Sequence, residues 1–282
     1  MNWLYLTLLS VLFVSIANIL QRVLMKGDKS NPYSYAIVFH ILLGTINLAF
    51  ALLFGSNLSL FSGNIVLLIL SSLLWGICTI FLFKALQLLE ASEVTILSTI
   101  RIVITIIASM VFLQEVFNNQ RVLGTIIIIA STILVANLKK GFRFNKGVIY
   151  VLAMSLFAGL AIVADSFNVK HYDVLSYNAI QNFLSGIFLL LFYPKALQQW
   201  KQFIQPSFLK KMLPLVIFST IQGVAYLLAL TTPGVTAQVA TIRQASVILT
   251  VVLSISFLGE KDNLLRKLGA AILVTIGVIL LS

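Results

Sequence analysis

Two arginines lie near the middle of long apolar stretches. Arg101 falls within residues 93–113 and Arg243 within residues 235–257, and both stretches are long enough to cross a membrane. An arginine at that depth costs at least about 2.5–3.5 kcal/mol on insertion scales, and it usually faces a cavity or a partner. Two guanidinium groups that converge on one cavity can bind a carboxylate or a phosphate through paired hydrogen bonds. In the alternative interpretation, each arginine braces the helices by binding carbonyl oxygens or an internal acid such as Asp165.

Each arginine is matched by a serine one helical turn away. When the two stretches are aligned without gaps at an offset of 145 residues, Arg101 falls on Ser246 and Ser98 falls on Arg243. Residues three positions apart share one face of a helix. We therefore expect these four side chains to form a substrate-binding surface to which both stretches contribute.

Four other polar residues occupy matching positions in the two parts of the chain. His40 and Asn182 form one such pair, and Asn18 and Asp165 form another. A histidine titrates near neutral pH, which would suit a coupling role. Asp165 could carry a proton or neutralise an arginine. Alternatively, such side chains only hydrogen-bond a neighbouring helix, which is worth about 0.6 kcal/mol on average.

Aromatic and amide side chains near these positions could form a wall of the same cavity. Trp75, with Gly76, corresponds to Gln222, with Gly223, and Tyr226 lies one turn further on. An aromatic ring beside a small residue can make one side of a ligand site. The alternative is packing against helices or lipid. Two glutamines flank Arg243 and could line the same cavity: Gln238 and Gln244.

The sequence offers no catalytic or metal-binding motif. It has no nucleotide-binding glycine loop, no His-Glu-x-x-His, no Gly-x-Ser-x-Gly and no acid-rich metal cluster. The single cysteine, Cys78, excludes an internal disulfide and a cysteine-based metal site. We therefore expect no enzymatic activity, no cofactor and no bound metal.

The composition shows which elements must position these residues. Of the 282 residues, 60% are apolar and only 10% are charged, which excludes an ordinary soluble protein. Lipid offers no partner to unpaired backbone groups, so apolar stretches of about 20 residues are expected to be helices. We predict an all-α polytopic membrane protein with ten transmembrane helices, the first of them retained and not cleaved as a signal. The expected spans are roughly 3–24, 33–54, 64–84, 93–113, 120–138, 147–168, 174–193, 212–231, 235–257 and 264–281, with a short surface helix possible in the connection 194–211.

The chain repeats itself. Residues 112–115 read FLQE and residues 257–260 read FLGE, and each motif is followed at the same spacing by Asn, Arg and Gly. Five spans make up each copy, so the second copy starts on the opposite side of the membrane. We therefore predict two inverted five-helix repeats, 1–140 and 141–282, around a central cavity, an arrangement that recurs in secondary transporters.

These residues resemble the EamA family of the drug/metabolite transporter superfamily. The resemblance rests on the Leu-x-Glu after spans four and nine, with Gly124 and Gly269 nine residues further on. It implies a carrier whose central cavity is lined by helices from both halves. Many members have a proline in the middle of spans four and nine, whereas this chain has Thr-Ile-Arg there, so we expect span four to lack that kink.

The motif residues themselves are expected to be structural. Glu115 and Glu260 suit the positive end of the helix that follows each of them. Asn118 and Asn263 can cap those helices. The two glycines, Gly124 and Gly269, would let helices approach closely.

The basic residues are distributed unequally between the two sets of loops. The connections between spans 1–2, 3–4, 5–6, 7–8 and 9–10 hold fifteen of the nineteen Lys and Arg residues, whereas the other loops hold Arg121 and Lys170. Cytoplasmic loops carry such an excess, which also explains the net charge of +11 without a nucleic-acid partner. The prediction is a multi-pass protein of the cytoplasmic membrane with both termini outside, although the family led us to expect cytoplasmic termini.

The leading functional hypothesis is a secondary transporter that moves a small anionic or zwitterionic metabolite, such as an amino acid or organic acid, by alternating access. Its partners would be this substrate and the lipid bilayer, and the chain would be a monomer or a homodimer. The alternatives are a membrane protein that handles a lipid or an isoprenoid phosphate, as a flippase or an enzyme, and a non-transporting membrane subunit.

Overall fold

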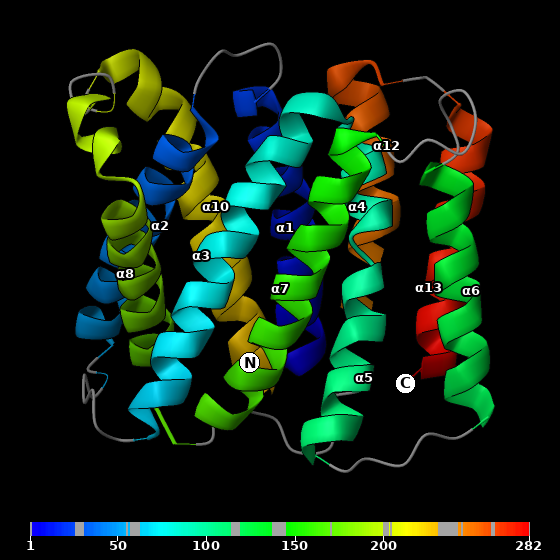
Figure 1. Cartoon of the computed structure of the whole chain (residues 1–282), viewed down its shortest axis with the longest axis horizontal. Helices are drawn as coiled ribbons and strands as arrows, with labels where there is room; N and C mark the ends of the chain where they lie inside the picture. Colours follow the sequence, from blue (N-terminus) through cyan, green and yellow to red (C-terminus); the bar gives the residue numbers. More distant parts are fainter. Residues whose placement is uncertain are drawn as a thin grey trace.

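The computed structural model describes residues 2–25, 31–54, 56, 63–113, 119–136, 145–169, 171–199, 203, 205–230, 242–243, 245–260 and 263–281, and these contain helices and no strand (Figure 1). The elements are α1 (Trp3–Met25), α2 (Pro32–Leu53), α3 (Ile65–Leu88), α4 (Ala91–Leu97), α5 (Ile100–Leu113), α6 (Asn119–Ala136), α7 (Lys146–Asn168), α8 (Val174–Phe192), the 3-10 helix η1 (Pro194–Gln199), α10 (Pro206–Leu230), α12 (Ala245–Leu258) and α13 (Leu264–Leu281).

Six of the described helices are long and apolar enough to cross a membrane, namely α1, α2, α3, α7, α8 and α10. Two shorter apolar helical segments, Val122–Ser131 and α12, accompany them. The chain is therefore a multi-pass helical membrane protein, as its composition predicts. The expected count of ten spans stays a prediction. The connection 194–211 holds η1, and α10 begins six residues earlier than the sequence suggests, at Pro206.

Short polar side chains begin several of these helices. Asn31, Asn64, Asn145 and Asp173 each accept a hydrogen bond from a backbone N–H in the first turn of the helix that follows. Such a cap satisfies one of the four N–H groups that have no partner within the helix. The loops therefore contain the signals that start the spans.

The expected span 93–113 forms two helices, α4 and α5, with Ser98 and Thr99 between them. Each of these residues donates its hydroxyl to the carbonyl three residues earlier, at 2.8 and 2.7 Å. Hydroxyl groups that bond to the preceding turn compete with the helical ladder and bend helices. The prediction that this span lacks a kink is wrong, because the two hydroxyl-bearing residues break it without proline. The break places Arg101 in the first turn of α5.

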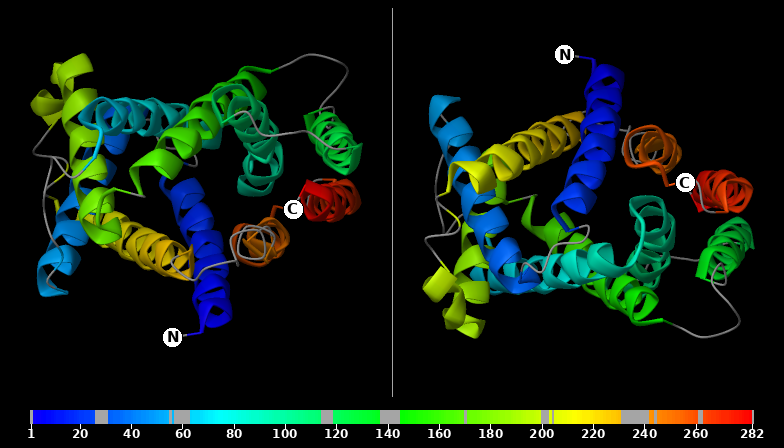
Figure 2. Two further views of the ribbon diagram at one scale, coloured as in Figure 1. Left: turned by 90° about the horizontal axis from the view of Figure 1, so that it is seen from below. Right: turned by 90° about the horizontal axis from the view of Figure 1, so that it is seen from above.

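The most extensive helix contacts join the two halves of the chain. α2 packs against α8 and α6 packs against α13, and both are pairs of repeat-related helices. α3 packs against α7, and α1 packs in the corresponding way against α10. Seen along the helices in Figure 2, α1, α10 and α12 lie on one side and α3, α7 and α5 on the other, with the α2–α8 and α6–α13 pairs at the two ends. The halves thus share one bundle.

Two repeat-related glycines set the distance between α2 and α8. A Cβ on Gly44 would lie 2.8 Å from the backbone nitrogen of Phe183, and a Cβ on Gly186 would lie 2.7 Å from the Ile41 side chain. No side chain fits at either position without a shift of the partner helix. By contrast, a Cβ on Gly269 would meet nothing within 4 Å, so the close approach expected there is absent. Gly277 provides it instead, because its Cβ would lie 3.0 Å from the carbonyl oxygen of Gly124.

The two ends of the bundle differ in charge. We call the end where α1 and α12 finish and α2 and α13 begin the basic end, and it is the upper end in Figure 1. α1 begins and α13 finishes at the opposite end. Among the described residues, the basic end carries Arg22, Lys84, Lys146, Lys195, Lys210, Lys211, Arg266 and Lys267.

Candidate functional site

Arg243 lies between an amide and an aromatic ring of α10. Its Nη2 donates to Gln222 Oε1 at 2.8 Å, and its guanidinium carbon lies 3.8 Å from the centre of the Tyr226 ring. The second contact is a cation–π interaction. Arg101, half-buried on α5, is close enough to Arg243 and Tyr226 to interact electrostatically with both. Three of the predicted site residues, Arg243, Gln222 and Tyr226, are therefore in direct contact, and Arg101 acts on the arginine and the tyrosine through its charge.

Neither guanidinium group is bound to a carboxylate within the described part of the chain. The ion pairs that the structure describes join Arg22 to Glu260 and Lys267 to Glu90. The pairing of an arginine with Asp165 is not found among the described contacts, where the partners of Asp165 are neutral. Two like charges in a low-dielectric bundle repel each other, and no described carboxylate offsets this repulsion.

The two predicted serines differ in their burial and in their hydrogen bonds. Ser98 is buried, and its hydroxyl is engaged within its own helix at the break described above. Ser246 is half-buried, and its backbone carbonyl accepts a hydrogen bond from the Ser15 hydroxyl at 3.3 Å. Ser98 thus shapes the chain before Arg101, while Ser246 ties α12 to α1.

His40 and Asn182, predicted to occupy one repeat position, contact each other directly. His40 Nδ1 lies 3.0 Å from Asn182 Oδ1, and its Nε2 lies 2.8 Å from Thr79 Oγ1. Since the amide oxygen only accepts, Nδ1 carries a proton. When the ring is neutral, Thr79 donates its hydroxyl to Nε2. When the ring is charged, Nε2 donates to Thr79 Oγ1, and the Thr79 hydroxyl donates to the Trp75 carbonyl oxygen at 2.9 Å. The imidazole is buried and hydrogen-bonded through both nitrogens.

Asp165 is the centre of a second polar cluster, built from α3, α7 and α8. Its Oδ1 accepts hydrogen bonds from Ser71 Oγ, from Tyr177 Oη at 2.5 Å and from Gln181 Nε2 at 2.8 Å. Its Oδ2 accepts the Trp75 indole N–H at 2.8 Å. The Trp75 side chain therefore contacts Asp165, while Gln222 and Tyr226, its expected neighbours in the site, contact Arg243. Asn18, at the repeat position of Asp165, donates to Thr250 Oγ1 at 3.2 Å.

Glu260 binds the beginning of a helix in the other half of the chain. Its carboxylate accepts the backbone N–H groups of Ala91 and Ser92, at 3.3 and 3.5 Å, and the Ser92 hydroxyl at 3.3 Å. The sequence led us to expect a contact with the helix that directly follows the motif. Gly259 explains the difference, because its φ of 66° ends α12 in the left-handed conformation and turns the chain. Asn263, at φ 52°, precedes α13.

The Glu260 carboxylate belongs to a larger group of charges at the basic end. Arg22 of α1 pairs with it at 3.4 Å and also binds the Leu86 carbonyl. Lys267 of α13, fully buried, pairs with Glu90. Each ion pair joins one half of the chain to the other. We call these four residues the ion-pair cluster: Arg22, Glu90, Glu260 and Lys267.

Four further residues singled out in the sequence lie outside the described residues. They are Gln238, Gln244, Glu115 and Asn118.

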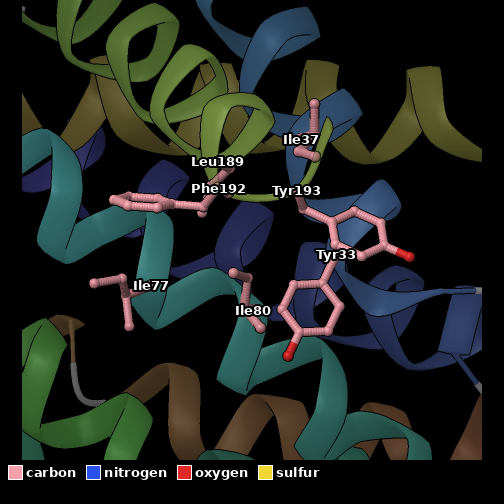
Figure 3. A pocket seen from close by; sticks show the side chains of 7 residues that line it. All are labelled: Tyr33, Ile37, Ile77, Ile80, Leu189, Phe192 and Tyr193. Atoms are coloured by element: carbon pink, nitrogen blue, oxygen red, sulfur yellow. The ribbon is translucent and has the colours of Figure 1, made fainter. Parts of the chain in front are cut away.

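An apolar groove of about 480 Å³ lies between α2, α3 and α8 (Figure 3), and neither Arg101 nor Arg243 lines it. Its lining is Tyr33, Ile37, Ile77, Ile80, Leu189, Phe192 and Tyr193. The two tyrosine rings stack with centres 5.0 Å apart, and the Lys84 ammonium donates to the Tyr33 hydroxyl at 2.6 Å. The polar groups of this groove therefore lie toward the basic end.

Comparison with known proteins decides the family. The model of the EamA-like transporter family matches this chain twice, over residues 1–137 and 145–282. The chain belongs to the EamA-like transporter family. The two matches correspond to the two halves that the FLQE and FLGE motifs mark. No curated protein matches the chain.

Solved structures share the fold of this EamA-like protein. Matches are found to 26 chains. One of them, a crystal structure of a protein, is 16% identical with a TM-score of 0.65, and the alignment covers 97% of this chain and 94% of that one. The family consists of transporters, so this EamA-like chain is a membrane transporter of the drug/metabolite superfamily.

Several partners of Trp75 and Asp165 in this EamA-like protein were not predicted from the sequence, although a signal for them exists. Ser71, Trp75 and Thr79 follow one another at intervals of four along α3. Tyr177, Gln181 and Ser185 do the same along α8. Residues four apart share a helix face, so each series is a polar stripe, and the Asp165 cluster forms where the two stripes meet.

Proposed function

We propose that this transporter carries a small anionic or zwitterionic metabolite across the cytoplasmic membrane by alternating access. The observation that supports it most is the pair Arg101 and Arg243, two cations within electrostatic reach of each other. Within the described residues no carboxylate neutralises either of them. A bound carboxylate or phosphate would supply the missing negative charge and accept paired hydrogen bonds from the guanidinium groups.

The residues around the arginines suit an amino acid or organic acid. Gln222 Oε1 fixes one edge of the Arg243 guanidinium group, and the Tyr226 ring covers one of its faces. These contacts hold the cation in one orientation while leaving other N–H groups to bind a substrate. Arg101 approaches from the other side of the bundle, on α5, so the two halves would each contribute one arginine to a shared site.

The ion-pair cluster supports alternating access. Alternating access in carriers built from two repeats is largely the rocking of one repeat against the other around a fixed site. Both ion pairs join the halves at the basic end, and a movement that opened this end would have to separate them. The repeat positions of Arg22 and Lys267 hold Val169 and Val122, so these two cations are not repeated at the equivalent positions. In the proposed cycle, the ion-pair cluster closes the cytoplasmic side.

The substrate class can be tested with purified protein. Ligand binding raises the thermal stability by about 2.7 kcal/mol at a hundredfold excess over the dissociation constant. We expect carboxylates from a panel of amino acids and organic acids to raise the unfolding temperature, and uncharged sugars and organic cations to leave it unchanged. Stabilisation by organic cations alone would contradict the proposal.

A lipid-handling function is the alternative that one observation favours. The groove between α2, α3 and α8 is apolar, and Phe192, which lines it, is 72% exposed. Phospholipid translocation in vesicles, measured with a labelled lipid, would distinguish this function from metabolite transport.

A further inference from the structure

The carboxylate of Asp165 is satisfied entirely by neutral side chains among the described residues. Ser71, Tyr177, Gln181 and Trp75 all donate to it, three to Oδ1 and one to Oδ2. The donors also bond to one another, since Gln181 Nε2 lies 2.5 Å from Ser71 Oγ and 3.1 Å from Tyr177 Oη. An ionisable side chain inside a membrane bundle is costly and usually marks an ion or substrate pathway.

We infer that Asp165 is the site at which this transporter binds and releases a coupling proton. This inference rests on the proposed function, to which it adds the identity of the coupling ion. It does not involve the arginine pair, which lies outside the Asp165 cluster.

The chemistry of the donors favours a proton over a metal cation. Two of the four groups around the carboxylate are the N–H groups of Trp75 and Gln181, which donate hydrogen bonds and cannot coordinate a cation. A metal cation of the hard type needs six or more oxygen ligands, or ordered waters in their place. The described residues also contain no group of three acids, histidines or cysteines suited to a metal ion.

The donors to Asp165 come from both halves of the chain, and this arrangement would couple proton binding to movement of the halves. Ser71 and Trp75 belong to α3 in the first half, whereas Asp165, Tyr177 and Gln181 belong to α7 and α8 in the second. If the halves moved apart here, the carboxylate would lose two of its four hydrogen bonds. Burying an unsatisfied charge is expensive, and taking up a proton removes that charge. The protonation state would therefore follow the conformation, which is what a coupled carrier requires.

Other ionisable groups lie near this site. Tyr177 of α8 touches the carboxylate directly. Tyr172, which follows α7, packs its ring against that of Tyr177, with the centres 5.9 Å apart. His40 of α2 is linked to it through Thr79 and the backbone of Trp75. Of the helices packed against α7, α3 carries Cys78 and α5 carries Arg101 toward the middle of the bundle, and neither is among the four donors to Asp165. α4, the other helix packed against α7, carries Glu93 near the basic end.

Proton binding can be measured without any substrate. The sequence has three tryptophans, and the Trp3→Phe, Trp200→Phe variant keeps Trp75 alone as a fluorophore in contact with Asp165. We expect its emission to titrate with pH and the titration to be lost in Asp165→Asn. Gln181→Leu, which removes one donor and leaves the carboxylate, should retain a titration with a moved midpoint. An unchanging emission in the parent, or the same titration after the Asp165→Asn substitution, would overturn the inference.

Vesicle transport separates this inference from the proposed function. Labelled succinate and L-glutamate serve as probes, in counterflow without a pH gradient and in net uptake driven by one. We expect Asp165→Asn to retain counterflow and to lose the stimulation by the pH gradient. If the pH gradient still stimulates uptake by Asp165→Asn, the proton site is contradicted. If the wild type shows no counterflow, the proposed substrate class is contradicted instead. In that case the fluorescence titration decides the proton site.

Discussion

Lys267 and Glu90 form an ion pair between the two halves of the chain, and the lysine is completely buried. The pair lies beside a second one, Arg22 with Glu260, whose carboxylate also receives two backbone N–H groups from the start of α4. Buried ion pairs contribute little net stability compared with apolar residues of the same size. Because both pairs join the two halves at the basic end, they would have to break for this end of the transporter to open.

Breaking the Lys267–Glu90 pair should be costly, because it leaves one charge buried without a partner. We expect Glu90→Gln to lower the free energy of unfolding by about 3–5 kcal/mol, measured by denaturation in mixed micelles. The exchange of both charges, Glu90→Lys with Lys267→Glu, should recover a large part of this loss. If the double exchange is as unstable as the single variant, the two side chains do not form the pair described here.

Access to the basic end should change when both ion pairs are neutralised. Ser92 is fully buried beside Glu260. In a Cys78→Ala background, we expect Ser92→Cys to react slowly with a membrane-impermeant maleimide. Combining it with Arg22→Met, Glu260→Gln, Glu90→Gln and Lys267→Met should raise the reaction rate several-fold. An unchanged rate would show that the ion-pair cluster does not hold this end closed.

The α2–α8 contact depends on glycine. A methyl group at Gly44 would overlap the backbone of Phe183, so we expect Gly44→Ala to destabilise the protein by about 1–3 kcal/mol. Gly269→Ala is the matched control, since its methyl group would meet open space and alanine favours a helix by up to about 1 kcal/mol. Thermal unfolding of the two purified variants measures the difference. Equal unfolding temperatures would contradict the close approach at Gly44.

We predict that the excess of Lys and Arg at the basic end orients the chain in the membrane. Because cytoplasmic loops carry such an excess, we expect both termini to lie outside the cytoplasm. Alkaline phosphatase fused after Ser282 should then be active, and a fluorescent protein at the same position should be dark. The reverse pattern would mean that charge does not determine the orientation of this chain.

The repeat made part of the site predictable from sequence. His40 and Asn182 were placed at one repeat position, and they touch because the repeat-related helices α2 and α8 pack against each other. Arg243, Gln222 and Tyr226 were proposed as one site and form direct contacts. For His40 and Asn182 the pattern along the chain is sufficient, because repeat-equivalent helices meet.

Other contacts depend on tertiary packing that no local pattern specifies. The break before Arg101 requires the Ser98 and Thr99 hydroxyls to turn back onto their own helix, a choice of side-chain conformation. Glu260 reaches the start of α4 only because α12 lies against it in the folded bundle. The partners of Asp165 come from three helices, and the polar stripes on α3 and α8 indicate them only once these helices are known to be neighbours.

The central claim is that Arg101 and Arg243 together bind the anionic group of the substrate. Counterflow of labelled succinate and L-glutamate in vesicles tests it most directly, with Arg266→Ala, an exposed arginine of α13, as the control variant. A hydrogen bond to a charged group is worth about 1.5–3 kcal/mol, so Arg101→Ala and Arg243→Ala should each weaken apparent affinity roughly tenfold to a hundredfold. Arg266→Ala should transport as the wild type does. Wild-type counterflow in both Arg101→Ala and Arg243→Ala would contradict the account.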